Sequence, residues 1–125
     1  MKIFLIIGIV FCGLSVVLGA FGAHGLKSHL NEYAMALFQT GVQYQMSHGL
    51  ALIGLVLFCG KSPSTKPLFI AGIAFVLGVL IFSGSLYAIA LTGIKKLGMI
   101  TPIGGLSFIV AWISFLYGVI RTDFS

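Results

Sequence analysis

The stretch IFLIIGIVFCGLSVVLGAFGA, from Ile3 to Ala23, decides the fold class because it contains no charged side chain. An α-helix needs about 20 consecutive apolar residues to cross the hydrocarbon core of a bilayer. The stretch therefore predicts a transmembrane helix over residues 3–23. A cleavable signal peptide is the alternative, since Lys2 and Ala20-Phe21-Gly22 resemble its basic start and cleavage site. Its apolar part is usually only about 7–15 residues long, so we expect the helix to be retained.

Three further apolar runs follow along the chain. Asn31 and Glu32 predict an N-cap and an acidic first turn for the second helix, which should protrude from the bilayer core at its start. The segment GKSPSTKP, Gly60 to Pro67, predicts a solvated turn. Pro102 suits the first turn of the last helix, where its missing N–H costs little. The predicted helices span about 3–23, 32–58, 68–92 and 99–120.

Composition agrees with a chain whose solvent is lipid. Of the 125 residues, 59% are hydrophobic and only 7% are charged, and the mean hydropathy is +1.18. Two acids and seven bases cannot cover the surface of a soluble domain of this size. The sequence predicts one domain, residues 1–125, of the all-α class: a polytopic membrane protein with four transmembrane helices in a compact bundle.

The net charge of +5 comes from bases that flank the apolar runs rather than from a clustered basic face. This pattern indicates topology signals and contacts with anionic lipid head groups, and it argues against nucleic-acid binding. Four spans place both termini on one side, with Lys2, Lys61, Lys66 and Arg121 there and Lys27, Lys95 and Lys96 opposite. The excess of bases predicts that both termini are cytoplasmic.

The second predicted helix carries an unusual number of polar side chains at membrane depth. The candidate intramembrane polar site comprises His24, Gln39, Thr40, Gln43, Tyr44, Ser47 and His48. At about 100° per residue, the members from 39 to 48 cover roughly half of the helix circumference. They could hydrogen-bond to neighbouring helices, line a polar cavity or partner-binding surface, or lie in a water-facing protrusion.

Metal, cofactor and catalytic chemistry have little support in the sequence. His24 and His29 are five residues apart and not on one helix face, and Glu32 is the nearest carboxylate. The other carboxylate, Asp123, lies in the C-terminal tail. Cys12 and Cys59 stand alone inside apolar runs and are expected to be packing residues. We therefore expect no cofactor, no metal and no enzyme activity.

Small residues recur at intervals of four on two predicted helices. They are Ser15, Gly19 and Ala23 on the first, and Gly84, Ala88 and Thr92 on the third. Such stripes allow two helices to approach closely. They predict helix packing within the chain, with contacts between protomers as the alternative.

Four segments together resemble a known family: LGAFGAHGLKSHL from Leu18, FQTGVQYQMSHGLAL from Phe38, FSGSLYAIALTG from Phe82 and GMITPIGGLSFIVAW from Gly98. The chain resembles domain-of-unknown-function family 423 and transmembrane protein 256-like proteins over nearly its whole length. The resemblance implies a four-helix protein of the bacterial plasma membrane, with Ala20–Gly25 and Gln43–His48 as hallmarks. It transfers no catalytic residue.

These observations favour a non-catalytic accessory or interaction protein of the plasma membrane. Its expected partners are membrane lipids and either further copies of itself or another membrane protein, with no nucleic acid. The alternative is an oligomeric transporter or channel for small solutes or ions that uses the polar face of the second helix. A third class, cofactor or quinone binding through His24 and His48, requires both histidines to reach the same membrane depth.

Overall fold

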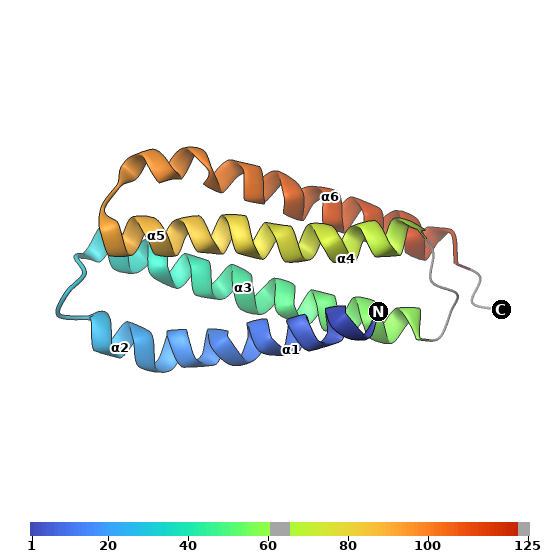
Figure 1. Cartoon of the computed structure of the whole chain (residues 1–125), viewed down its shortest axis with the longest axis horizontal. Coiled ribbons are helices and arrows are strands. Elements are labelled where there is room, and N and C mark those ends of the chain that lie inside the picture. Colours follow the sequence, from blue (N-terminus) through green and yellow to red (C-terminus); the bar gives the residue numbers. More distant parts are fainter. Residues whose placement is uncertain (61–65, 123–125) are drawn as a thin grey trace.

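The computed structural model describes residues 1–60 and 66–122, and every regular element in these residues is a helix. Four helices are long and apolar enough to cross a membrane: Lys2–Leu26, Glu32–Cys59, Lys66–Thr92 and Lys95–Ile120. Figure 1 shows them lying side by side along the long axis of the molecule. The predicted all-α membrane fold with four transmembrane helices is confirmed.

The first spanning helix runs further than residues 3–23. It consists of α1 (Lys2–Val16), a π-helical segment (Val17–Gly22) and α2 (Ala23–Leu26), which follow one another without a break. His24 therefore lies in the last helical turn and not in a polar break after it. The extension is possible because His24 and Gly25 both keep their backbone N–H groups, unlike proline.

The second spanning helix is α3 (Glu32–Cys59). Its predicted start is confirmed, because Asn31 Oδ1 accepts a 2.7 Å hydrogen bond from Ala34 N and Glu32 lies in the first turn. With 28 residues it is about 42 Å long, more than the bilayer core requires. One face of α3 is buried in the bundle: Phe38, Gly41, Gln45, His48, Gly49, Leu52, Leu55 and Cys59.

The third spanning helix consists of α4 (Lys66–Gly78), a π-helical segment (Val79–Ser83) and α5 (Gly84–Thr92). It ends at Gly93, whose φ of 74° is the left-handed conformation that glycine supplies at helix C-termini. Of the predicted turn Gly60–Pro67, residues 61–65 lie outside the described part, while Lys66 and Pro67 already belong to α4.

The fourth spanning helix begins with a 3-10 turn (Lys95–Met99) that leads into α6 (Thr101–Ile120). Pro102 lies in the first turn of α6, as predicted. Met99, the predicted first residue of this helix, belongs to the 3-10 turn instead.

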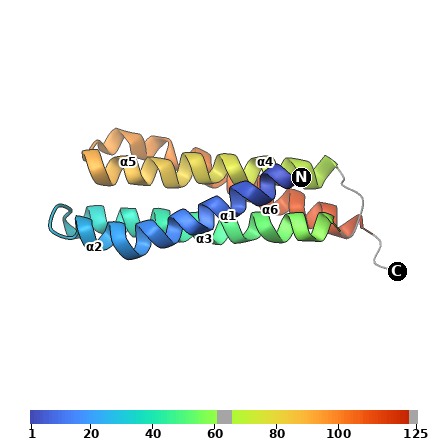
Figure 2. The same cartoon turned by 60° about the horizontal axis from the view of Figure 1, so that its bottom comes forward.

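Helices α3 and α4–α5 form the centre of the bundle, with α1 packed along α3 and α6 packed along α4. Figure 2 shows α1 crossing from the side of α3 towards α4, where the rings of Phe4 and Phe69 lie 5.7 Å apart. The largest fully buried side chains include Phe75, Leu52 and Leu55. The main core cluster contains buried residues from all four spanning helices, with Phe4 from α1 and Ala111 from α6.

Gly19, from the stripe predicted on the first helix, does lie against α3, since a Cβ there would be 3.2 Å from Val42 Cγ1. Other close contacts use glycines outside the predicted stripes. A Cβ on Gly49 would lie 3.0 Å from Phe11 Cβ and 3.1 Å from the carbonyl oxygen of Gly8, so α1 and α3 meet almost backbone to backbone. Gly84, from the stripe predicted on the third helix, has nothing within 4 Å of such a Cβ. Spacing therefore identified part of the contact face on the first helix but not at Gly84 on the third, because several faces of these helices carry small residues.

Candidate functional site

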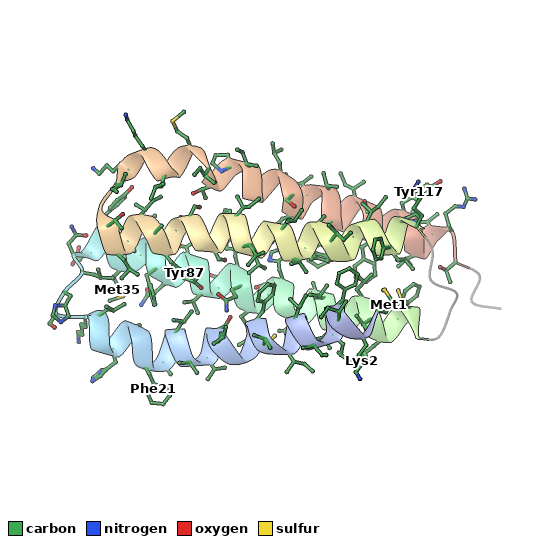
Figure 3. All side chains as sticks on the ribbon, in the orientation of Figure 1. Met1, Lys2, Phe21, Met35, Tyr87 and Tyr117 are labelled. Carbon is green, nitrogen blue, oxygen red and sulfur yellow. The ribbon has the colours of Figure 1, made fainter. Side chains whose placement is uncertain are left out.

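Gln45 forms the central polar junction of the bundle. Its side chain is 5% exposed, its Nε2 donates to the carbonyl oxygen of Phe11 at 2.9 Å, and its Oε1 accepts from the Tyr87 hydroxyl at 2.7 Å. Figure 3 shows Tyr87 on the inner side of α5. The carboxamide therefore joins α1, α3 and α5 at one point, with both of its polar atoms hydrogen-bonded.

Gly41, one turn before Gln45, makes room for this junction. A Cβ at Gly41 would lie 2.7 Å from Tyr87 Cε1, which is too close for two carbon atoms. The carbonyl oxygen of Gly41 also accepts a 2.7 Å hydrogen bond from the hydroxyl of Ser83, the last residue of the π-helical segment before α5. Gly41 thus lets α5 approach α3 closely enough for two interhelical hydrogen bonds.

His48 is enclosed by aromatic rings at the contact between α3 and α6. It is 7% exposed, and its ring stacks on Phe108 with 3.7 Å between centroids and an interplanar angle of 15°. Nδ1 lies 2.8 Å from the carbonyl oxygen of Tyr44, and the indole N–H of Trp112 donates to Nε2 at 3.1 Å. A carbonyl only accepts and an indole only donates, so these partners select the neutral imidazole with its proton on Nδ1.

This geometry leaves His48 without a free ring nitrogen for a metal or for proton transfer to a substrate. His24 and His29 do not join it, because both are exposed at the end of the bundle where α3 begins. His48 lies about 24 Å further along α3 at a rise of 1.5 Å per residue. Among the described residues, no three His, Cys, Asp or Glu side chains gather closely enough to hold a metal ion.

The outward side of α3 carries the remaining polar residues of the predicted site. Gln39, Gln43 and Ser47 are exposed, and Thr40 is half-buried. The two hydroxyls bond back to their own helix: Thr40 Oγ1 donates to Ala36 O and Ser47 Oγ donates to Gln43 O, each at 2.9 Å. The carboxamides of Gln39 and Gln43 form no hydrogen bond within the described part of the chain.

The predicted polar face is therefore divided between two sides of α3. His48 faces the interior, Tyr44 lies at the edge with 39% exposure, and Gln39, Gln43 and Ser47 face outward. Gln45, which the predicted site omitted, is the most enclosed polar side chain of the passage. The sequence shows only that Gln45 shares a helix face with Gly41, Gly49 and Leu52, at spacings of four and seven. That this face is the buried one is shown by the structure.

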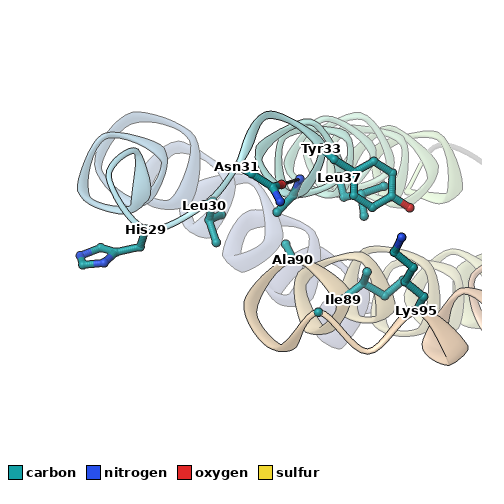
Figure 4. A pocket seen from close by; sticks show the side chains of 10 residues that line it. His29, Leu30, Asn31, Tyr33, Leu37, Ile89, Ala90 and Lys95 are labelled. Atoms are coloured by element: carbon teal, nitrogen blue, oxygen red, sulfur yellow. Dashed lines mark hydrogen bonds between the residues drawn. The ribbon is translucent and has the colours of Figure 1, made fainter.

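A hollow of about 260 Å³ lies at the end of the bundle between the start of α3 and the end of α5. Figure 4 shows Tyr33, Leu37 and Lys95 along it, with the Lys95 ammonium 5.5 Å from the centre of the Tyr33 ring. A cation held over an aromatic ring at a helix end suits the head-group region. This hollow does not include any of the polar residues from 39 to 48.

Comparison with known proteins identifies relatives over almost the full length. Residues 18–105 match the family described as protein of unknown function (DUF423). The chain is 40% identical over 121 residues to the UPF0382 membrane protein YwdK of Bacillus subtilis, an alignment that covers 97% of this chain and 98% of that protein. It is 45% identical to the UPF0382 membrane protein SH2409 of Staphylococcus haemolyticus, with the same two coverages.

A protein of Escherichia coli is also similar. The UPF0382 inner membrane protein YgdD of Escherichia coli is 40% identical over 106 residues, which cover 85% of this chain and 80% of YgdD. No solved structure matches the chain significantly. The relatives are membrane proteins, in agreement with the four spanning helices, and their names assign no reaction.

Proposed function

The chain belongs to the family described as protein of unknown function DUF423, and from this premise we propose that it is a non-catalytic accessory protein that binds a transmembrane helix. The binding surface is the outward side of α3. The observation that carries this proposal is the unpaired carboxamide of Gln43, which faces out of the bundle within the membrane.

The depth of Gln43 makes its lack of an intramolecular partner costly. It lies about 16 Å from the start of a helix that is about 42 Å long. The helix exceeds a bilayer core of about 30 Å by about 12 Å, so Gln43 lies inside the core even when all of that excess protrudes at the start. Hydrocarbon offers no hydrogen bond to an amide, and leaving one unpaired there costs several kcal/mol in the least polar environments. A hydrogen-bonding group on a neighbouring helix at the same depth would remove this cost.

The residues around Gln43 support a helix as the partner. Seven residues follow one another at alternating intervals of four and three along α3, and we call them the outer seam: Ala36, Thr40, Gln43, Ser47, Leu50, Gly54 and Leu57. Six of the seven are exposed and Thr40 is half-buried. At about 100° per residue they lie within an arc of about 100°, opposite the buried face of α3. This is the shape that a second helix packs against.

The proposal that the protein is not an enzyme rests on the placement of its reactive groups. His48 has both ring nitrogens occupied, and Glu32 is exposed at the start of α3, far along the helix from His48. Cys12 lies in the contact between α1 and α3, where its Sγ is 3.8 Å from the carbonyl oxygen of Met46, and Cys59 is buried. No nucleophile, base and orienting group meet among these residues.

Transport through a single bundle has less support than helix binding. An internal path for ions or small solutes needs inward-facing polar groups that are free to bind them. The inward polar side chains Gln45, Ser83 and His48 instead hydrogen-bond to neighbouring helices or to the backbone of α3. The polar groups left free face away from the bundle.

For location, we propose the plasma membrane with both termini in the cytoplasm. Lys2 and Arg121 lie at one end of the bundle, where Figure 1 shows the start of α1 and the end of α6, while Lys27, Lys95 and Lys96 lie at the other. Lys66, at the start of α4, joins the first group, and Lys61 lies outside the described residues. Alkaline phosphatase fused after Arg121 should stay inactive, and a fluorescent protein fused there should fluoresce.

Photo-crosslinking in intact membranes tests the binding surface. A photoreactive phenylalanine derivative replaces Leu50 on the outer seam, and in a matched control it replaces Leu80 on the third spanning helix. These two leucines are 56% and 57% exposed. We expect an adduct of one defined mass from the Leu50 position, absent from the Leu80 position and reduced in yield by Gln43→Leu. Equal labelling from both positions, or none from Leu50, contradicts the proposal.

A further inference from the structure

We infer that the helix bound at the outer seam is α3 of a second copy of this chain, in the same orientation across the membrane. This inference rests on the proposed function, because it names the partner for the same surface. Three observations support the inference: the spacing of the seam, the chemistry of the Gln43 carboxamide, and the small side chains before and after Gln43 on the seam.

The spacing of the outer seam suits packing against the same seam of a second copy. Alternating intervals of four and three average 3.5 residues, the repeat of a left-handed coiled coil in which two helices keep the same faces together. The pattern is unbroken from Ala36 to Leu57, which is most of α3. Two parallel copies related by a two-fold axis along the membrane normal would therefore stay in contact through the bilayer core.

Gln43 is self-complementary in that arrangement. A carboxamide carries both a donor NH₂ and an acceptor oxygen, so two copies of Gln43 can each donate to the other. In a parallel two-fold pair every residue near the axis meets its own copy at the same depth. Both carboxamides would then be hydrogen-bonded without requiring a polar residue from any other protein.

The surroundings of Gln43 leave room for this approach. Ala36, Ser47 and Gly54 are small and exposed, and nothing lies within 4 Å of a Cβ placed on Gly54. Neither α1 nor α6 therefore shields the seam at that point. Small side chains at intervals allow helix backbones to approach closely in membranes, while Leu50 and Leu57, at 56% and 61% exposure, supply the larger contacts.

The other outward faces do not call for a protein partner in the same way. α1 presents Ile3, Ile6 and Ile9, and α6 presents Ile109, Ile113 and Leu116. These bulky apolar side chains are well solvated by lipid. The outer seam of α3 combines small residues with a carboxamide that has no hydrogen bond within the described part of the chain and lies inside the bilayer core, which is why we assign the contact to it.

Disulfide scanning in native membranes tests the inference. Single cysteines replace Thr40, Gln43, Ser47, Leu50 and Gly54 on the seam, with Leu80 and Ile109 as exposed controls on other helices. The unmodified chain measures the background from Cys12 and Cys59. Under mild oxidation we expect disulfide-linked dimers at the seam positions only. Dimers at the control positions instead of the seam would overturn the inference.

A second measurement follows the carboxamide itself. By sedimentation equilibrium in detergent, Gln43→Leu should raise the dimer dissociation constant about three- to eight-fold, the value of one or two membrane hydrogen bonds at about 0.6 kcal/mol each. Its helix content should stay unchanged, because the carboxamide of Gln43 makes no hydrogen bond within the described part of the chain. A dissociation constant that does not change overturns the role of Gln43 in self-association.

The disulfide scan and the Leu50 photo-crosslink together separate the inference from the proposed function. If seam cysteines form no dimers while the Leu50 photo-crosslink captures a different protein in a Gln43-dependent manner, the second copy is wrong and helix binding stands. If the seam yields neither dimers nor adducts, both fail. If the Leu50 adduct has the mass of two chains and the seam cysteines cross-link, both hold.

Discussion

Trp112 donates its indole N–H to Nε2 of His48 at 3.1 Å, and this hydrogen bond connects the middle of α6 to the middle of α3. The bond fixes the tautomer of the imidazole, since Nδ1 must then carry the proton that is directed to the carbonyl oxygen of Tyr44. A histidine in a membrane span often marks a pathway for protons or solutes. Here its hydrogen bonds identify a structural role.

Replacement of Trp112 by Phe should destabilise the protein by about 1–3 kcal/mol, because Nε2 of the buried His48 loses its donor. Phe can still pack against Phe75, whose ring lies 5.0 Å from that of Trp112. Reversible unfolding in mixed micelles measures the change. The control is the same substitution in a His48→Phe background, where the cost should be much smaller. Equal costs in both backgrounds would mean that the two side chains are not coupled.

Nitrogen NMR of the imidazole tests the tautomer directly. With histidine labelled at both ring nitrogens, we expect His48 to show a protonated Nδ1 and an unprotonated Nε2 in the native protein. Trp112→Phe should change the Nε2 signal, because that nitrogen loses its hydrogen bond. A spectrum with the proton on Nε2 would disagree with the hydrogen-bond pattern described above. His24 and His29 are exposed and provide internal references.

Gln45 and Gln43 form a matched pair on one helix, with the same side chain in opposite environments. Gln45→Leu removes both interhelical hydrogen bonds and leaves the Tyr87 hydroxyl unpaired, so we expect a loss of about 1–3 kcal/mol in the free energy of unfolding. Gln43→Leu should cause no loss when the chain is diluted enough to be monomeric. Greater destabilisation from Gln43→Leu than from Gln45→Leu would reverse the assignment of inner and outer faces.

Gly41→Ala should disturb the contact between α3 and α5. The new Cβ would lie 2.7 Å from Tyr87 Cε1, so the tyrosine ring must move and its hydrogen bond to Gln45 weakens. We expect a loss of about 1–3 kcal/mol, the usual cost of overpacking. Gly13→Ala on α1 is the control, because nothing lies within 4 Å of its Cβ. That change should be neutral or slightly stabilising.

Asn31→Ala should lower stability by about 1 kcal/mol through loss of the N-cap of α3. The side chain of Asn31 accepts from Ala34 N, which would otherwise have no partner in the first helical turn. Asn31→Asp should retain most of the stability, because a carboxylate accepts the same hydrogen bond. An unchanged stability in Asn31→Ala would show that the cap contributes nothing, and an equal loss from both substitutions would show that the side-chain acceptor is not the cause. Thermal unfolding in detergent, followed by circular dichroism, measures both.

Sequence alone determined the number of spans and several of their ends. An apolar run of about 20 residues forms a helix in lipid because every backbone polar group must then be satisfied within the segment. Three helix ends depend on local effects: the N-cap of Asn31, the fixed φ of Pro102 and the left-handed conformation of Gly93. These ends could therefore be predicted without knowing which helices are neighbours. The family was recognisable for the same reason, from motif order along the chain.

Only the tertiary structure decided which polar residues of α3 face inward. Periodicity placed Gln43 and Gln45 on different sides of the helix, but it could not say which side meets other helices. In a soluble protein the apolar face marks the interior. In a membrane the lipid is as apolar as the core, so an apolar face does not identify the side that meets other helices. The inward positions of Gln45 and His48 were shown only by their hydrogen bonds to Phe11, Tyr87 and Trp112 on other helices.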